Sequence, residues 1–290
     1  METRWLYVTS GDFNKLREAS CDTCIIPVGS VEKHGAHLPL GTDIMHSSHI
    51  AWMASQMETV CVFPDFTFGD MPGKCQPPGT ITIPMETELL LLEQLCEQIA
   101  RNGFKKILFY NGHGGNNVWL SAFLRNIENK PHNYVPMKMV IPGTVLSMLG
   151  EKIIAEGIGC IPELTKEDEE LILEYYQGDY TEGGHGGFGE TAYILGIYPE
   201  TVKMDRLGVE SGKSLHFGRK YAKAGIEIRD GGWDISYPNS YSGDDPIGCN
   251  ERIGKAAIRL EAERVAKAIK LIKEDIDLVR IHNERWETNI

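Results

Sequence analysis

The residues Thr23-Cys-Ile-Ile-Pro-Val28 are followed directly by Gly29-Ser-Val-Glu-Lys-His-Gly-Ala-His-Leu-Pro-Leu-Gly-Thr-Asp43, so an apolar run precedes a loop rich in glycine and polar side chains. A short apolar run bounded by turn residues is typical of a strand buried in a parallel sheet. In open parallel sheets, ligands bind outside the carboxyl ends of the strands. This stretch therefore predicts an α/β fold with a binding loop after its first buried strand.

The first half of the chain alternates strand-like and helical stretches, which is the signature of βαβ units and a parallel sheet. Thr165, followed three residues later by Asp168, resembles the capped start of a helix. Because no linker or internal repeat divides the chain, we expect one domain over residues 1–290. The predicted strands are 23–28, 60–63, 105–110 and 137–141, and the predicted helices are 44–57, 85–102, 117–129, 164–177 and 251–279.

The charge balance argues against several classes of partner. The chain has 41 acidic and 29 Lys and Arg residues, a formal charge of −12 that repels nucleic-acid backbones. We find no apolar run of about 18 residues that could cross a membrane. The seven cysteines, an odd number, favour free thiols in a reducing, cytoplasmic compartment. Cys21 and Cys24 form one CxxC without a second, and we expect Cys24 to be a core residue.

Three segments carry the residues suited to chemistry. Glu32 and His34 are two apart, so an extended backbone points both side chains the same way, and Asp43 returns after a Pro/Gly turn. Asn111-Gly-His113-Gly-Gly-Asn116 follows the strand that ends near Tyr110 and precedes a helix. The third segment, His185-Gly-Gly-Phe-Gly-Glu190-Thr191, is again rich in glycine, which lets a backbone approach a ligand closely.

Imidazole nitrogens and carboxylate oxygens suit Zn²⁺, Mn²⁺ or Fe²⁺, and a carboxylate shared by two ions gives a two-metal site. Each residue also has an ordinary interpretation. Glu32 alone could be an exposed loop charge, and His113 alone could be a hydrogen-bonded residue at a helix start. The occurrence of all three clusters, after strands or between glycines, favours the metal site.

These segments resemble the creatininase (creatinine amidohydrolase) family. The resemblance lies in the run 29–43, in Pro78-Gly-Thr-Ile81, in the Asn-Gly-His segment 111–116 and in 185–191, which follow one another in the family's order. It implies a Rossmann-like three-layer α/β/α domain with a mostly parallel sheet, a binuclear Zn or Mn site, and a homo-oligomer, commonly a hexamer.

The resemblance also implies the ligands. Glu32, His34, Asp43 and His113 match metal-ligand positions, with Asp43 at the bridging carboxylate. Creatininase proper has a further ligand Glu where this chain has Gly115, which offers no side chain. Members with the Gly-Gly form use the Glu of the third motif instead, so the resemblance implies that Glu190 is the fifth ligand.

The substrate differs from creatinine in this interpretation. Creatinine-cleaving members enclose the flat ring with tryptophans between the second and third motifs, whereas residues 120–184 contain none. Other family members open formamides or cyclic amides, or clip residues from a peptide-derived precursor. We expect His37 to support a ligand from outside the site, and His46 and His49 to be structural or surface residues on a helix.

The sequence thus predicts a hydrolase that cleaves a C–N bond of a small amide with water activated by two metal ions, and with His185 carrying the proton to the leaving nitrogen. Alternatives are a peptidase acting on a peptide-derived precursor, a two-metal phosphoesterase, and a non-catalytic sugar- or nucleotide-binding module. No GxGxxG or Walker pattern supports the last.

Overall fold

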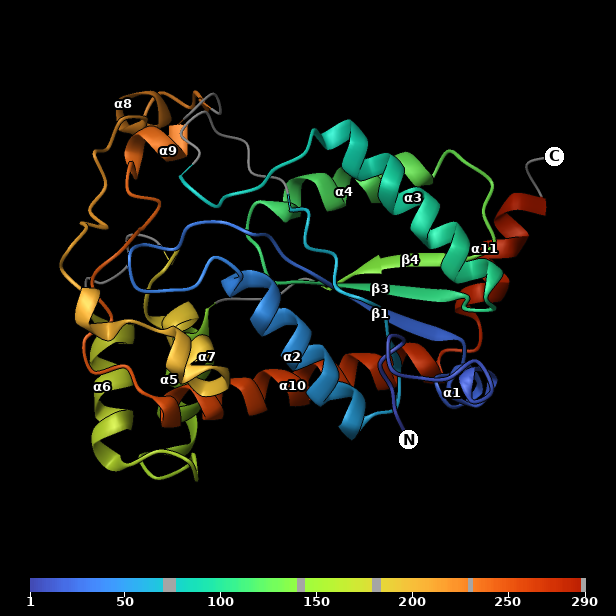
Figure 1. The fold of residues 1–290 in the computed structure, drawn as a ribbon, viewed down its shortest axis with the longest axis horizontal. Helices are drawn as coiled ribbons and strands as arrows, with labels where there is room; N and C mark the ends of the chain where they lie inside the picture. The colour runs from blue at the N-terminus through green and yellow to red at the C-terminus, as the bar shows by residue number, and fades with distance from the viewer. Residues whose placement is uncertain (70–76, 140–143, 179–183, 229–231, 288–290) are drawn as a thin grey trace.

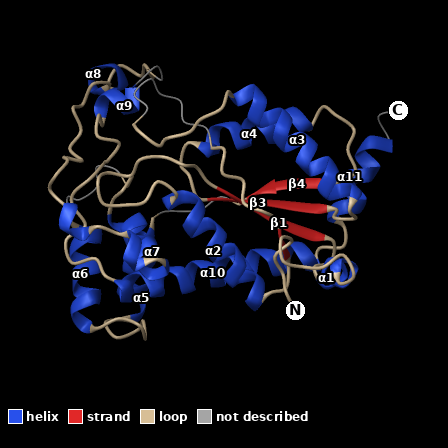
Figure 2. Ribbon diagram, viewed as in Figure 1, coloured by secondary structure: helices blue, strands red, loops and turns tan. Residues whose placement is uncertain are grey.

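The computed structural model describes the chain except residues 70–76, 140–143, 179–183, 229–231 and 288–290. Its centre is a parallel sheet with helices packed on both sides (Figure 2), which confirms the predicted three-layer α/β/α fold. Within the described residues the sheet has four strands in the order β2-β1-β3-β4. These are β1 (Thr23–Val28), β2 (Cys61–Val62), β3 (Lys106–Asn111) and β4 (Val135–Lys138).

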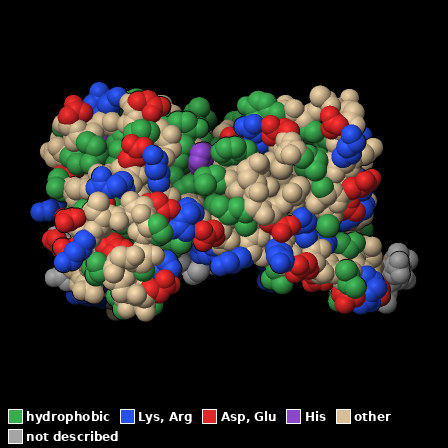
Figure 3. Space-filling model, turned by 90° about the horizontal axis from the view of Figure 1, so that it is seen from below, with side chains coloured by type: hydrophobic (Ala, Val, Ile, Leu, Met, Phe, Trp, Pro, Cys, Tyr) green, Lys and Arg blue, Asp and Glu red, His purple; other side chains and the backbone are tan. Residues whose placement is uncertain are grey.

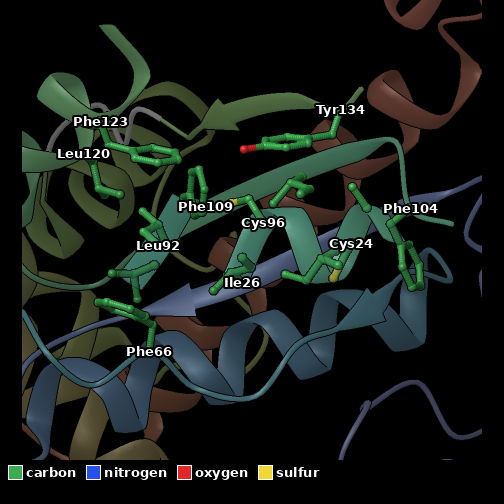
Figure 4. Packing of buried hydrophobic residues seen from close by; sticks show 14 of the residues in the cluster. Cys24, Ile26, Phe66, Leu92, Cys96, Phe104, Phe109, Leu120, Phe123 and Tyr134 are labelled. Atoms are coloured by element: carbon green, nitrogen blue, oxygen red, sulfur yellow. The ribbon is translucent and has the colours of Figure 1, made fainter. Parts of the chain in front are cut away.

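Two pairs of helices cover the sheet (Figure 1). On one face lie α3 (Met85–Arg101) and α4 (Asn116–Ile127), and on the other lie α2 (Thr42–Met57) and α10 (Glu251–Glu274). The faces of β1 alternate as a strand requires, because Ile25 belongs to the cluster of α2 and α10, whereas its neighbours face α3 and α4. Figure 4 shows this second packing, in which Cys24 and Ile26 lie among side chains of α3 and α4.

A third apolar cluster joins the second half of the chain to α10. It is built from α5 (Val145–Glu156), α6 (Lys166–Gln177) and α7 (Phe188–Ile197). Glycines let α7 and α10 touch, since a side chain on Gly254 would overlap the backbone of Ala192 and Gly196. The remaining helices are α1 (Phe13–Ala19), η1 (Pro199–Thr201), η2 (Met204–Arg206), α8 (Arg219–Ala222), α9 (Gly232–Ser236) and α11 (Leu278–Glu287).

The predicted elements of the first half are found with small shifts at their ends. The first strand has its predicted bounds, and α6 carries the predicted cap, with the Thr165 hydroxyl and the Asp168 carboxylate each accepting from the other residue's backbone N–H. The fourth strand lies two residues earlier than predicted, because β4 pairs with β3 in the register Lys106↔Val135. The end of its predicted range, residues 140 and 141, lies outside the described residues.

The single long helix predicted over residues 251–279 is wrong at its end. Helix α10 stops at Glu274, and Asp275 adopts extended backbone angles. Its carboxylate then accepts hydrogen bonds from the backbone N–H groups of Asp277 and Leu278, which caps α11. Ile276, which lies inside the predicted helix, is 87% exposed as a result.

No helix in the described ranges is long and apolar enough to cross a membrane. The six cysteines in these ranges are free thiols, and Cys24 is buried as expected. On the face drawn in Figure 3, basic and acidic side chains are interspersed.

The contact between α7 and α10 gives a stability test. Replacing Gly254 with Ala forces the two helices apart, so the free energy of unfolding should fall by about 1–3 kcal/mol, the usual range for an overpacked core. Gly218 is the matched control, because it has a helical φ of −81° and no atom within 4 Å of an added Cβ. Gly218→Ala should change stability by less than about 1 kcal/mol. Equal urea midpoints for both variants would contradict this account of the contact.

Candidate metal centre

The loop after β1 brings three of the predicted ligands together at the carboxyl edge of the sheet. Glu32 and His34 lie on this loop, and Asp43 lies in the first turn of α2. The two ends of the loop touch at Gly29, where an added Cβ would sit 2.6 Å from the Cα of Ile44. Only glycine allows this approach, because any side chain here would overlap the start of α2. The loop therefore folds back on itself and brings Asp43 next to the end of β1.

The loop after the neighbouring strand β3 supplies His113. The Asn111 side chain holds it by accepting from the His113 N–H at 3.1 Å and donating to the His113 carbonyl at 2.6 Å. Asn116 donates to the same Asn111 oxygen at 3.0 Å. The N–H of Gly112 donates to the Val28 carbonyl at 2.7 Å, which joins this loop to the end of β1.

Asp43 is shared by two groups of possible ligands. Its Oδ2 lies 3.0 Å from Nδ1 of His113, and the same nitrogen is 2.7 Å from Oε1 of Glu32. Its Oδ1 lies 3.1 Å from Nε2 of His34, which is also 3.5 Å from Oε2 of Glu190. The trios Glu32–Asp43–His113 and His34–Asp43–Glu190 could each hold a metal ion, with ligand atoms within 4.8 Å of one another.

The third motif completes the cluster from α7. Glu190 lies in the first turn of this helix and accepts from the N–H of Gly186 at 2.5 Å. The ring of His185 stacks on that of His34 with centroids 4.0 Å apart. Its Nε2 is 2.7 Å from the Lys33 carbonyl oxygen and 3.5 Å from Oε2 of Glu32. The trio Glu32–His34–His185 is a further geometric possibility for an ion.

All five residues predicted as ligands, together with His185, therefore lie in one cluster. Glu32 is 1% exposed, so the alternative of an exposed loop charge is wrong for this structure. Gly115 precedes the first residue of α4 and offers no ligand atom. Glu190 stands beside His34, where it can complete the second trio.

Two hydrogen bonds to backbone carbonyls fix which imidazole nitrogens carry hydrogen. A carbonyl can only accept, so His185 donates from Nε2 to Lys33, which leaves the lone pair of the neutral ring on Nδ1. His34 donates from Nδ1 to the Glu32 carbonyl at 3.2 Å, which leaves Nε2 for a metal ion. This arrangement orients His34 as a ligand requires.

Sequence reasoning missed the role of Ser30. Its hydroxyl lies 2.5 Å from Oδ2 of Asp43 and 3.1 Å from Oε1 of Glu32, and it is fully buried. The single O–H of Ser30 can donate to either oxygen, one at a time. Ser30 therefore lies between the two carboxylates and can stabilise the charge of either one. Its place two residues before Glu32 on the same extended stretch was the signal that could have identified it.

His46 and His49 lie on α2 outside the ligand trios, as expected, whereas His37, which was expected to support a ligand, contacts Thr191. His37 is buried, and its Nε2 lies 3.0 Å from the Thr191 hydroxyl, which ties the first motif to the third from outside the ligand cluster. His46 is buried against the ring of Tyr193 on α7, and His49 packs against Trp52. None of the three belongs to a trio that could hold a metal among the described residues.

The pKa values of two histidines in the cluster are raised by the neighbouring carboxylates. Burial disfavours the charged form of His34, but the charges of Asp43 and Glu190 outweigh it and raise its pKa to about 10. Burial likewise opposes the charge on His113, and its bonds to Asp43 and Glu32 nevertheless raise its pKa well above the usual value. Without bound ions, both rings are cations that offset the buried carboxylates.

Burial sets the direction of the pKa shift for Glu190, Glu32 and His185, but not for Asp43. It raises the pKa of Glu190 to about 7, and it raises the pKa of Glu32. Burial opposes the charge on Asp43, but the charges of His34 and His113 hold its pKa well below the usual value. Burial, together with the charge of His34, lowers the pKa of His185 to about 3, so this ring is neutral at pH 7.

The donor set fits divalent transition metals. It offers three carboxylates and up to three imidazoles and contains no thiol, which suits Zn²⁺ or Mn²⁺. Two cations would also replace the positive charge that His34 and His113 carry when protonated. The residues present therefore fit a pair of ions as well as a single one.

The chain matches a known family and several known proteins. The family model described as "Creatininase: Creatinine amidohydrolase" matches residues 7–269. A creatinine amidohydrolase of Pseudomonas putida is 23% identical over 190 residues, 63% of this chain and 67% of that protein. A mycofactocin precursor peptide peptidase of Mycolicibacterium smegmatis is 34% identical over 121 residues, 39% of this chain, and the match spans about half (48%) of its length.

Solved structures share the fold. A structure titled "Creatininase Mn" has a TM-score of 0.70 at 16% identity and covers 95% of this chain and 100% of its own. A mutant creatininase titled as "Zn-Zn type" has a TM-score of 0.69 at 16% identity, with the same coverage. At this level of identity the likeness establishes the fold alone.

The raised pKa values predict proton release when ions bind. At pH 7, His34 and His113 are protonated in chelator-treated protein, and Glu190, with a pKa of about 7, is partly protonated. Metal ions bind the neutral rings and the ionised carboxylate, so adding Mn²⁺ or Zn²⁺ should release at least about two protons per chain. The stabilisation of the ion-free protein by His34 is complete below about pH 6.5 and is lost as the pH rises through about 10. Calorimetry in buffers of different ionisation enthalpy measures the release. Binding without proton release would show that these rings are neutral.

Proposed function

Because this chain belongs to the creatininase family, we propose that it is a metal-dependent hydrolase that cleaves the C–N bond of a small amide, cyclic amide or formamide. The observation that carries the proposal is the position of Asp43, whose two carboxylate oxygens face two different trios of possible ligands. A carboxylate placed in this way is what a two-metal hydrolase needs to bridge its ions.

Each residue has a defined part in this proposal. Glu32 and His113 would hold one ion, His34 and Glu190 the other, and Asp43 both. When bound, such a pair of ions makes water nucleophilic at neutral pH and polarises the carbonyl under attack. The burial of Glu32, His34 and Asp43 strengthens the charge interactions at the centre.

His185 would move the proton. Its ring is neutral at pH 7, and its Nε2–H is committed to the Lys33 carbonyl. Nδ1 therefore has the lone pair that can take a proton from the attacking water and pass it to the leaving nitrogen, which must be protonated to depart. Contact with His34 keeps the ring beside the ligands throughout.

A second candidate is a peptidase acting on a peptide-derived precursor. It is favoured by the 34% identity to the mycofactocin precursor peptide peptidase, although that match covers only 39% of this chain. The same ligands and the same proton carrier would serve both reactions, so only substrate tests separate them. Creatinine itself is disfavoured, because residues 120–184 contain no tryptophan.

We propose that residues 1–290 fold as one domain, that the chain assembles with copies of itself, as a hexamer by family resemblance, and that its partner is a small-molecule substrate. Size measurement by light scattering tests the assembly directly.

Metal content tests the ligand assignment. Wild-type protein dialysed against trace Mn²⁺ or Zn²⁺ should retain about two ions per chain, whereas Glu190→Gln should lose about one and Asp43→Asn most of both, because only Asp43 belongs to both trios. Glu200→Gln, an exposed carboxylate outside the cluster, is the control. Elemental analysis gives the ratios. Wild-type protein without stoichiometric metal would favour the non-catalytic binding module instead.

The role of His185 separates chemistry from metal binding. In a screen of formamides, lactams, cyclic ureas and short peptides, His185→Ala should lower turnover of the best substrate by about 10²–10⁴-fold, the usual worth of a positioned acid–base group. Its metal content should match wild type. His49→Gln, a histidine outside the cluster, should keep full turnover. Equal loss of metal and activity in His185→Ala would make His185 a ligand.

A further inference from the structure

The ligand cluster is open to solvent on one side. The side chains of His34, Asp43 and Glu32 are 2% exposed or less. The more exposed members are Glu190 at 22% and His185 at 15%, and His113 is 9% exposed. The most exposed side of the cluster is therefore the one that Glu190 and His185 line.

Trp233 stands at this opening. Its ring meets that of His185 in a T-shaped contact, with centroids 5.0 Å apart and planes at 80°. Exposure rises from His34, which is fully buried, through His185 to Trp233, which is 42% exposed. These three rings thus form a continuous column from the ligands to the solvent.

Tyr237 helps to fix the position of Trp233. Tyr237 packs on its ring with centroids 5.3 Å apart, and the Tyr237 N–H donates to the Trp233 carbonyl at 2.8 Å. Both residues lie in or next to α9, which is 40 residues and more beyond the third motif. Figure 1 shows α9 beside α8, at the end of the molecule away from α11.

Backbone hydrogen bonds tie the chain after α9 to both ligand loops. The N–H of Gly35 donates to the Ser240 carbonyl at 2.8 Å, and the N–H of Ser242 donates to the His185 carbonyl at 2.8 Å. The Ser242 hydroxyl also accepts from the His185 N–H at 3.1 Å. These bonds therefore fix the position of the segment that carries Trp233 relative to the loops that carry His34 and His185.

We propose that Trp233 is a specificity-determining residue of the substrate pocket, where its indole contacts the part of the substrate that lies away from the scissile bond. This inference rests on the proposed function and deepens it by naming the substrate class. A half-exposed indole beside a metal centre favours flat apolar or aromatic substituents, because stacked and edge-to-face ring contacts add to the burial of apolar surface. The preferred amides thus carry a planar or aromatic group.

Two hydroxamates test the proposal without knowledge of the true substrate. Acetohydroxamate and benzohydroxamate share the group that chelates divalent ions through two oxygens, and they differ only in a methyl or a phenyl substituent. In protein loaded with Mn²⁺ or Zn²⁺, benzohydroxamate should bind about tenfold more tightly by calorimetry. Trp233→Ala should abolish most of this preference and leave acetohydroxamate affinity unchanged, and Trp233→Phe should keep part of it.

Phe217→Ala is the matched control, since Phe217 lies in the same part of the chain and is equally exposed at 42%. It should leave the preference intact. An unchanged preference in Trp233→Ala, or an equal loss of affinity for both hydroxamates, would overturn the inference. Failure of either hydroxamate to bind wild-type protein, together with absence of metal, would instead overturn the proposed function. Thermal unfolding and metal content identify any variant that fails to fold.

Discussion

The centre of this molecule is constrained by the charge of three carboxylates that lie together in a largely buried cluster. Asp43, Glu32 and Glu190 lie close enough to repel one another, and burial removes the water that would screen them. Positive charge must be supplied, either by protonated His34 and His113 or by metal ions at the same positions. The shared carboxylate of Asp43 links both solutions, because each of its oxygens already faces one of the two imidazoles.

The fold serves this constraint by bringing strand ends and helix starts into direct contact. Asp43 and Glu190 both lie in first turns of helices, where the helix dipole favours negative charge. The contacts are made close by glycine, at Gly29 between β1 and α2 and at Gly254 between α10 and α7. The ligands are therefore positioned by backbone packing, and their own side chains need little rearrangement to meet.

Much of the fold and the centre could be predicted from sequence, for local reasons. Apolar strands followed by polar, glycine-rich loops place Glu32, His34 and His113 at one sheet edge, because β1 and β3 are neighbours. The end of α10 was mispredicted, because a periodic apolar pattern carries no record of the Asp275 side chain turning to cap the next helix. Trp233 escaped prediction because its place depends on backbone hydrogen bonds between segments distant in the chain, which have no sequence signature.

The separation of Trp233 from the ligand motifs has a consequence for how such a protein can diverge. The possible ion ligands lie between residues 32 and 190, whereas Trp233 beside them comes from a later stretch that is attached through main-chain bonds at Ser240 and Ser242. Main-chain bonds tolerate changes of side chain. Substitutions in that later stretch could therefore change which substrates are preferred, while the proposed reaction stays the same.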